Sequence, residues 1–419
     1  MKHFFLMIYF VLATATQATA EIPTVHCPTE PPSVRRLQLQ EQWRIDAEDP
    51  DAPLLSFFDQ SQILVHDGRV YLLDRQLSHI LVYSDDGEFL ETIMREGDGP
   101  GEVRNPGVMF LCGDGRIAVQ HGYPTKLEFV DLDGTPRGRW RLKSNAWVNR
   151  IRETPLGWFG VYSESRESDD PGIYTRVFHV ALHDNEGGRT GEFYSESKKQ
   201  DFMKGSTTSE ADEYNPWYTA IPIGDGQIVY AVARDEYRLE WRNLEGDITR
   251  VVSRDFTAHQ RTQAELDKIK YSNYTIANDE LMFADRKLCD RDPMIHTLEP
   301  QPDGSLRVRT SLFEKDMPDG MVCRYEVHEP NGELRERVEI YDPTGDYDVN
   351  YDVIAILDDG RAMVLRNLRP AFRAATDARL HPDLLEKLPP IPDGRQDVAF
   401  TPVMCDLVSV SGKNKPAAQ

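Results

Sequence analysis

The sequence has few cysteines, few helical patterns and, after its first twenty residues, no long apolar stretch. It contains five cysteines among 419 residues, with 48 basic against 70 acidic side chains and a net charge of −22. No segment beyond residue 20 approaches the ~20 apolar residues that span a bilayer. The acidity argues against binding to nucleic acid or to an anionic membrane surface, because both require basic patches. The composition therefore predicts a large, acidic, β-rich protein.

Several motifs of known enzyme classes are also missing. There is no Cys-x-x-Cys pair for zinc, no Gly-x-Ser-x-Gly elbow and no sialidase-type Asp box. The glycine-rich run from Gly97 to Gly101 lacks the lysine and the strand-loop-helix context of a phosphate-binding loop. A Ser-His-Asp triad can still assemble from distant segments. The sequence therefore indicates no particular catalytic chemistry.

The first twenty residues have the pattern of a secretory signal peptide. Lys2 precedes an apolar run from Phe4 to Leu12, and Ala18-Thr19-Ala20 forms a small-residue cleavage site. We expect cleavage near Ala20 and a secreted or periplasmic protein with no transmembrane segment in the mature chain; an N-terminal anchor is the alternative. The residues before Cys27 are not small, which argues against a lipoprotein.

A four-strand pattern occurs twice between Ile63 and Leu142. Each copy has apolar strands separated by Asp-Gly turns, and both turns recur after 47 residues, from Asp67 to Asp114 and from Asp86 to Asp133. A four-stranded unit at this spacing is typical of a β-propeller blade. Asp-Gly suits these turns because tight hairpins require positive φ. We predict an all-β, six-bladed propeller of four-stranded antiparallel blades with short helical insertions, because further Asp-Gly, Glu-Gly and Asn-Gly turns follow at similar spacing.

The ends of the predicted ring come from both ends of the chain. Leu37, Leu39, Trp43 and Ile45 alternate with polar residues and predict a strand that pairs with the last blade and closes the ring. We place the propeller at residues 34–411 and a disordered tail at 412–419. Three insertions are expected near 195–214, 257–290 and 370–397, the second with a Thr262/Glu265 capping box and the third with a short helix from Pro382 to Leu388.

The junction after the first blade resembles that of NHL-repeat propellers. The segment Gly97-Asp-Gly-Pro-Gly-Glu102, followed by Pro106-Gly-Val108, is similar to the inter-blade signature of that family, and Asp67 to Asp74 with His79 to Tyr83 resembles its strand-turn-strand core. The similarity covers roughly residues 63–120. It implies a six-bladed ring used mostly for binding, although secreted relatives of this architecture include lyases and lactonases.

One set of basic residues is predicted to share a rim of the ring. The turn that follows the second strand of several blades carries Arg75, His121, Arg234, Arg366 and Arg369. Converging cations could bind a small anionic ligand, a peptide terminus or a protein. The alternative is that each arginine pairs locally with a neighbour such as Asp74 or Asp235.

The cysteines of an exported chain can form disulfides. We consider Cys289–Cys323, which flank two predicted strands of one blade, and Cys27–Cys405, which lie near the two chain ends. Cys112 would then be a buried free thiol.

The sequence favours a ligand- or protein-binding scaffold that uses one rim, without a cofactor. The alternative is a Ca²⁺-dependent lactonase or lyase with its site in the central channel. A purely structural envelope protein is a third possibility that the residues do not separate from the first.

Overall fold

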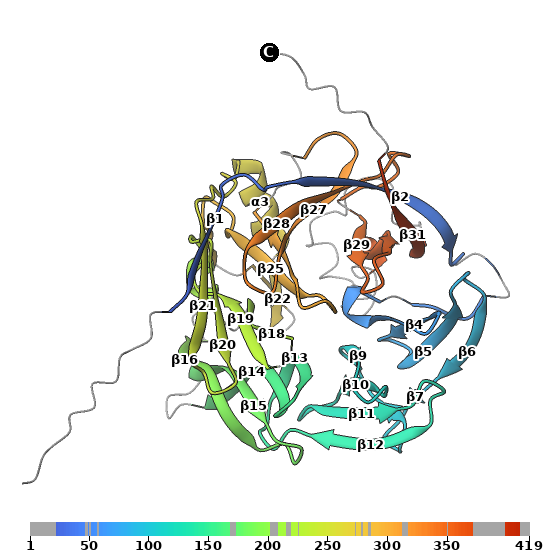
Figure 1. Ribbon diagram of the computed structural model, residues 1–419. Coiled ribbons are helices and arrows are strands. Elements are labelled where there is room, and N and C mark those ends of the chain that lie inside the picture. Colours follow the sequence, from blue (N-terminus) through green and yellow to red (C-terminus); the bar gives the residue numbers. More distant parts are fainter. Residues whose placement is uncertain are drawn as a thin grey trace, which may run out of the picture.

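Six four-stranded blades follow one another around a ring in the computed structural model (Figure 1). The structure describes residues 22–410, except 47–48, 50–51, 57, 168–172, 202–207, 215–218, 225, 273, 278–279, 284–285, 312–316, 350 and 372–398. The predicted signal peptide, the tail and the helix expected from Pro382 to Leu388 lie outside these residues.

The first three blades are consecutive along the chain, and each runs from the channel outward. Blade 1 has β3 (Ile63–His66), β4 (Arg69–Asp74), β5 (His79–Ser84) and β6 (Phe89–Ile93); blade 2 has β9 (Met109–Leu111), β10 (Ile117–His121), β11 (Lys126–Val130) and β12 (Pro136–Arg141); blade 3 has β13 (Trp147–Thr154), β14 (Gly157–Glu167), β15 (Ile173–His183) and β16 (Arg189–Asp201). Residues 195–201, which were expected to begin an insertion, instead continue β16, whose pairing with β15 reaches Asp201.

The remaining blades complete the ring. Blade 4 has β18 (Ile221–Ile223), β19 (Gln227–Ala231), β20 (Arg238–Asn243) and β21 (Ile248–Arg254); blade 5 has β25 (Ile295–Pro300), β26 (Leu306–Thr310), β27 (Met321–His328) and β28 (Leu334–Tyr341); blade 6 has β29 (Val353–Ile356), β30 (Ala362–Arg366), β31 (Thr401–Ser409) and β2 (Val34–Arg44). The all-β propeller prediction is therefore confirmed.

The N-terminal segment runs around the outside of the ring (Figure 1). β1 (Thr24–Cys27) pairs parallel with β21 of blade 4. β2 then pairs parallel with β28 of blade 5 and antiparallel with β31, so it is the outermost strand of blade 6. The predicted closing strand is thus present, and it also joins blades 5 and 6 into one eight-stranded sheet.

Short elements decorate the ring. They are the paired strands β7 (Arg95–Glu96) and β8 (Glu102–Val103), β17 (Thr208–Ser209) and β24 (Arg286–Lys287), and β22 (Tyr274–Ala277) and β23 (Glu280–Phe283), with the helices η1 (Gln60–Gln62), α1 (Glu210–Glu213) and α3 (Gln263–Ser272). The predicted capping box before α3 is present, because the Thr262 amide donates to the Glu265 carboxylate and the Glu265 amide to the Thr262 hydroxyl. None of the described helices is both long and apolar enough to cross a membrane.

The hydrophobic core lies between the blades. Val70 and Leu72 of β4 belong to a cluster shared with blade 6, whereas Tyr71 and Leu73 belong to a cluster shared with blade 2. Because successive side chains of a strand point to opposite faces, a blade buried on both faces needs a continuous apolar run. The two middle strands of blade 1, β4 and β5, have such runs.

Candidate functional site

Each blade exposes two kinds of turn on opposite rims of the ring. We call the rim that carries the first-to-second and third-to-fourth strand turns the AB rim, and the rim with the second-to-third strand turns the BC rim. The Asp-Gly turns of the repeat lie on the AB rim, where Gly68, Gly87, Gly115 and Gly134 all have positive φ as expected. The basic residues predicted as a ligand site lie on the BC rim.

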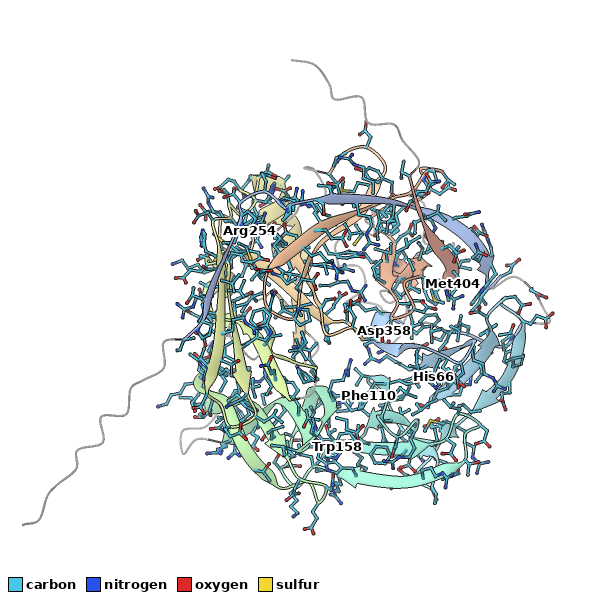
Figure 2. The ribbon with its side chains drawn as sticks, in the orientation of Figure 1. His66, Phe110, Trp158, Arg254, Asp358 and Met404 are labelled. Atoms are coloured by element: carbon cyan, nitrogen blue, oxygen red, sulfur yellow. The ribbon has the colours of Figure 1, made fainter. Side chains whose placement is uncertain are left out.

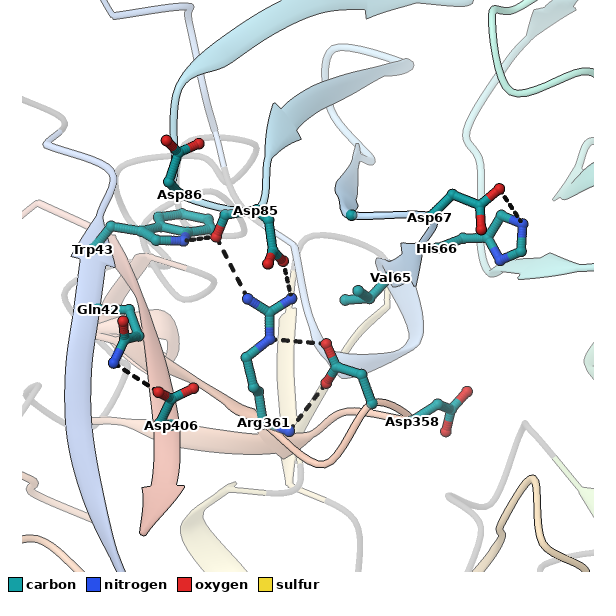
Figure 3. A pocket seen from close by; sticks show the side chains of 12 residues that line it. Gln42, Trp43, Val65, His66, Asp67, Asp85, Asp86, Asp358, Arg361 and Asp406 are labelled. Carbon is teal, nitrogen blue, oxygen red and sulfur yellow. Dashed lines mark hydrogen bonds and ion pairs between the residues drawn. The ribbon is translucent and has the colours of Figure 1, made fainter.

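A pocket of about 820 Å³ opens on the AB rim where blade 6 meets blade 1. The two AB-rim turns of blade 1, the first turn of blade 6 and the closing strand β2 contribute most of its lining. Its lining includes six aspartates against one arginine: Asp67, Asp85, Asp86, Asp358, Asp359, Asp406 and Arg361. His66, Gln42, Trp43 and Val65 complete the side of the pocket that Figure 3 shows. We call it the acidic pocket.

Arg361 is already neutralised by two of these aspartates. Its guanidinium contacts the Asp85 carboxylate at 2.7 Å, as a dashed line in Figure 3 indicates, and donates from Nε to Asp359 at 2.8 Å. Gln42 holds Asp406 through a 2.8 Å hydrogen bond. Two further carboxylates, Asp67 and Asp86, are exposed at the turns of blade 1, so the pocket has negative charge beyond what Arg361 balances.

Asp358 stands at the inner edge of the ring (Figure 2). The residue is exposed, but nearby protein partly desolvates its carboxyl group, which raises the pKa of that group despite the attraction of Arg307 and Arg152. Asp358 also borders a smaller pocket between blades 5 and 6. It therefore connects the acidic pocket to its neighbour on the same rim.

The basic residues predicted as an anion site are mostly engaged in local contacts. Arg234 is buried and pairs with Asp235 and Glu210, and Arg366 pairs with Asp352 and Asp342. Arg75 donates to the carbonyl of Pro106, whereas Arg369 is exposed. Asp74 pairs with none of the five; its carboxylate accepts the backbone amides of Ser56, Gln76 and Leu77.

His121 is buried in a setting that disfavours its cationic form. Only 2% of it is exposed, and burial, reinforced by Arg139 and Lys126, lowers the pKa of its imidazole to about 4. Burial thus disfavours the positive charge expected at this position, because every residue of the strand that carries His121 is buried.

All five cysteines are free thiols in the structure. Cys27 contacts His328 and the carbonyl of Gly332, whereas Cys405 lies in the hydrophobic cluster between blades 5 and 6. Cys323 is buried in that same cluster, and Cys289 is partly exposed, with its amide donating to Glu210. Cys112 is buried, as expected, and burial raises the pKa of its thiol to about 12. Among the described residues, no group of three or more His, Cys, Asp or Glu side chains has a metal-binding arrangement.

Comparison with known proteins agrees with this architecture. The sequence model of the family DUF5128, described as a six-bladed β-propeller, matches residues 56–274, just over half of the chain. The chain belongs to this family. The finer resemblance to NHL repeats stays a prediction, and no curated protein matches the chain.

Solved structures similar to this DUF5128 propeller have low sequence identity. One is a protein described as exported, from Bacteroides fragilis, with 13% identity, a TM-score of 0.47 and coverage of 92% of this chain and 99% of that chain. A protein of unknown function from Bacteroides caccae has 13% identity, a TM-score of 0.32 and coverage of 65% and 78%. Virginiamycin B lyase from Staphylococcus aureus has 13% identity, a TM-score of 0.32 and coverage of 79% and 97%.

The acidic pocket of this family member was not predicted from the sequence, although a signal for it exists. The tripeptide Asp-Asp-Gly occurs twice in the chain, at Asp85-Asp86-Gly87 and at Asp358-Asp359-Gly360. Both copies line the pocket, one from blade 1 and one from blade 6. The aspartate next to the glycine is used within its own turn, where Asp86 accepts from the Ser84 hydroxyl and Asp359 accepts from the Arg361 amide. The additional aspartate of each tripeptide, Asp85 or Asp358, is therefore the sequence signal for a concentration of negative charge.

Proposed function

We propose that the protein is a binding scaffold whose AB rim captures a cationic group, such as the side chain of arginine or lysine on a peptide or partner protein. The acidic pocket carries this proposal: about 820 Å³ of space lined by six aspartates, with a single arginine that two of them already hold. The volume lies within the range of ligand sites, roughly 300–1,000 Å³.

The chemistry of the lining favours a guanidinium or ammonium group on an apolar stem. Asp67 and Asp86 offer exposed carboxylates, and charge-assisted hydrogen bonds to such groups are the strong kind. Trp43 and Val65 add apolar wall against which the methylene groups of a long basic side chain can lie. A small anion would instead meet repulsion from most of the lining.

The test is a calorimetric titration of the purified protein with agmatine and with a tri-arginine amide, repeated at low and high salt. The double variant Asp67→Asn/Asp86→Asn should weaken agmatine binding by roughly tenfold, about 1.4 kcal/mol. The matched control is Asp114→Asn/Asp133→Asn, which changes the same two turns of blade 2, outside the pocket. It should change the affinity by less than about twofold.

Three outcomes count against the proposal. Absence of saturable binding, or an equal loss in both double variants, would refute it. Saturable Ca²⁺ binding that raises the melting temperature while agmatine does not bind would instead favour the metal-dependent lactonase or lyase.

We also propose that the protein is exported. The basic start, apolar run and Ala18-Thr19-Ala20 site support this placement. N-terminal sequencing of the protein from fractionated cells should find a chain beginning near Glu21 outside the cytoplasm; an intact Met1 in the cytoplasmic fraction would contradict it.

A further inference from the structure

A second, smaller pocket lies on the AB rim between blades 5 and 6. Its volume is about 260 Å³. Three arginines line it, Arg35, Arg307 and Arg335, together with Tyr325, Ser305 and Asp358. Asp358 also lines the acidic pocket, so the two pockets adjoin at this residue. We call the smaller one the arginine pocket.

Two of the three arginines are balanced by carboxylates. Arg35 binds Glu336 through two hydrogen bonds of 3.1 and 2.9 Å. Arg335 lies within 4 Å of Glu329, Glu336 and Asp303. Neither guanidinium therefore needs a further anion.

Arg307 is different because it is buried and its ion-pair partner, Glu299, is shared with Arg309. It is 4% exposed, its Nη1 donates to the carbonyl of Ile356 over 3.4 Å, and its Nε has no hydrogen-bond partner among the described residues. Glu299, the carboxylate nearest to Nε, is 3.7 Å away, and the Tyr325 ring centroid is 5.6 Å from the guanidinium carbon. A guanidinium has five N–H donors in a planar fork, and leaving buried donors unsatisfied is unfavourable.

We infer that the arginine pocket binds a carboxylate of the same ligand whose cationic group enters the acidic pocket. A carboxylate satisfies the fork of Arg307 with two parallel hydrogen bonds, which a neutral group does not. Asp358, between the pockets, attracts the cationic part and repels the anionic part, so it fixes the direction of the ligand. This inference rests on the proposed function and narrows its ligand to molecules that carry both charges, such as a peptide with a basic side chain and a free C-terminus.

The experiment compares peptides that differ only in the terminal carboxylate. Arginine followed by zero to four glycines is titrated as the free acid and as the C-terminal amide, with agmatine as the cation-only probe. At the best spacer length the acid should bind roughly tenfold more tightly than the amide. The Arg307→Met variant should reduce this ratio to below about twofold while agmatine affinity is retained, which also shows that the variant is folded.

Two further variants keep the test decisive. Arg242→Met, on β20 of blade 4 and outside the arginine pocket, should leave the acid-to-amide ratio unchanged. Asp358→Asn should weaken agmatine binding yet preserve or increase the ratio, and it remains informative if Arg307→Met does not fold. Equal affinities of acid and amide at every spacer length, with agmatine still bound, would overturn this inference alone. Failure of agmatine to bind would overturn the proposed function and this inference with it.

Discussion

Two junctions between blades use the same contact, and only one of them bears the acidic pocket. At the 2–3 junction, the indole of Trp140 on β12 donates to the carbonyl of Asp184 in the outer turn of blade 3. At the 6–1 junction, the indole of Trp43 on β2 donates to the carbonyl of Asp85 in the outer turn of blade 1. Both hydrogen bonds measure 3.0 Å. In each case a tryptophan on the outermost strand of one blade donates to the outer turn of the next blade.

The turns differ in what their aspartates do. The Asp184 carboxylate accepts the amides of Glu186 and Gly188, so it is used within its own turn. The Asp85 carboxylate instead reaches Arg361 of blade 6, and Asp86 beside it is exposed at the pocket. The same mechanical contact can therefore be kept while the charge around it changes, which is how one fold supports different sites.

The largest expected effect is the loss of stability when either junction tryptophan is replaced, and the two variants should differ in which strands loosen. Trp43→Ala and Trp140→Ala should each lower the free energy of unfolding by about 3–5 kcal/mol, because a large buried ring is lost. β12 is followed directly by blade 3, whereas β2 comes from the other end of the chain. We therefore expect Trp43→Ala to raise hydrogen exchange along β2 and β31. Trp140→Ala should raise it only near the contact between β12 and the outer turn of blade 3. Equal, global loosening in both variants would contradict this distinction.

The turn glycines should show a smaller difference. Gly187 has φ of +82°, and a Cβ there would overlap the backbone of Arg141, which cannot move aside; Gly87 has φ of +88°, and its Cβ would meet the Trp43 side chain. We expect Gly187→Ala to cost about 3 kcal/mol and Gly87→Ala about 2 kcal/mol. Chemical denaturation measures both.

Gly115→Ala is the control for this pair. Its φ is +84°, and no atom lies within 4 Å of the added Cβ, so it should show the backbone strain alone, about 1 kcal/mol. A cost for Gly187→Ala no larger than that of the control would show that blade 3 does not press on blade 2 as the contact implies.

Acid should weaken the 2–3 junction. His183, whose ring centroid is 6.2 Å from that of Trp140, is 1% exposed, and burial with nearby Arg189 lowers the pKa of its imidazole to about 4. Below about pH 6.5 the imidazole of His183 binds a proton in the unfolded chain but not in the folded chain. The free energy of unfolding is therefore undiminished above pH 6.5 and falls as the pH is lowered toward 4. The loss should be about 2 kcal/mol between pH 6.5 and 5.

The buried His121, at the end of β10 in blade 2, adds a similar dependence on pH. The pKa values of His79, His296 and His328 are lowered by burial as well, so His183→Leu should remove only part of the slope, measured by urea unfolding at the two pH values. An unchanged slope in this variant would mean that His183 is protonated in the folded protein.

The ring was predictable because its signals are local and repeated. The 47-residue shift of the Asp-Gly turns and the alternation from Leu37 to Ile45 each act within a few residues of the strand they specify. Several partners of the basic residues are distant in the sequence: Arg234 pairs with Glu210 as well as with the adjacent Asp235, and the buried His121 lies in a strand enclosed by neighbouring blades. The acidic pocket likewise joins turns that lie more than 250 residues apart, and only the repeated Asp-Asp-Gly tripeptide hinted at it.

The smallest effect on stability should be the sharpest on binding. Arg361→Gln removes partly exposed ion pairs, which contribute about 1 kcal/mol or less, yet it releases Asp85 and Asp359 from their cation. Agmatine affinity should rise about three- to tenfold, since the attraction between the pocket and a cation increases by one charge.

The matched control is Arg116→Gln, because Arg116 follows Asp114-Gly115 in blade 2 as Arg361 follows Asp359-Gly360, and binds its aspartate in the same way. It lies outside the pocket, so agmatine affinity should not change. If Arg361→Gln left the affinity unchanged or lowered it, the charge balance of the 6–1 junction would not govern binding, and the difference between the two junctions would be structural only.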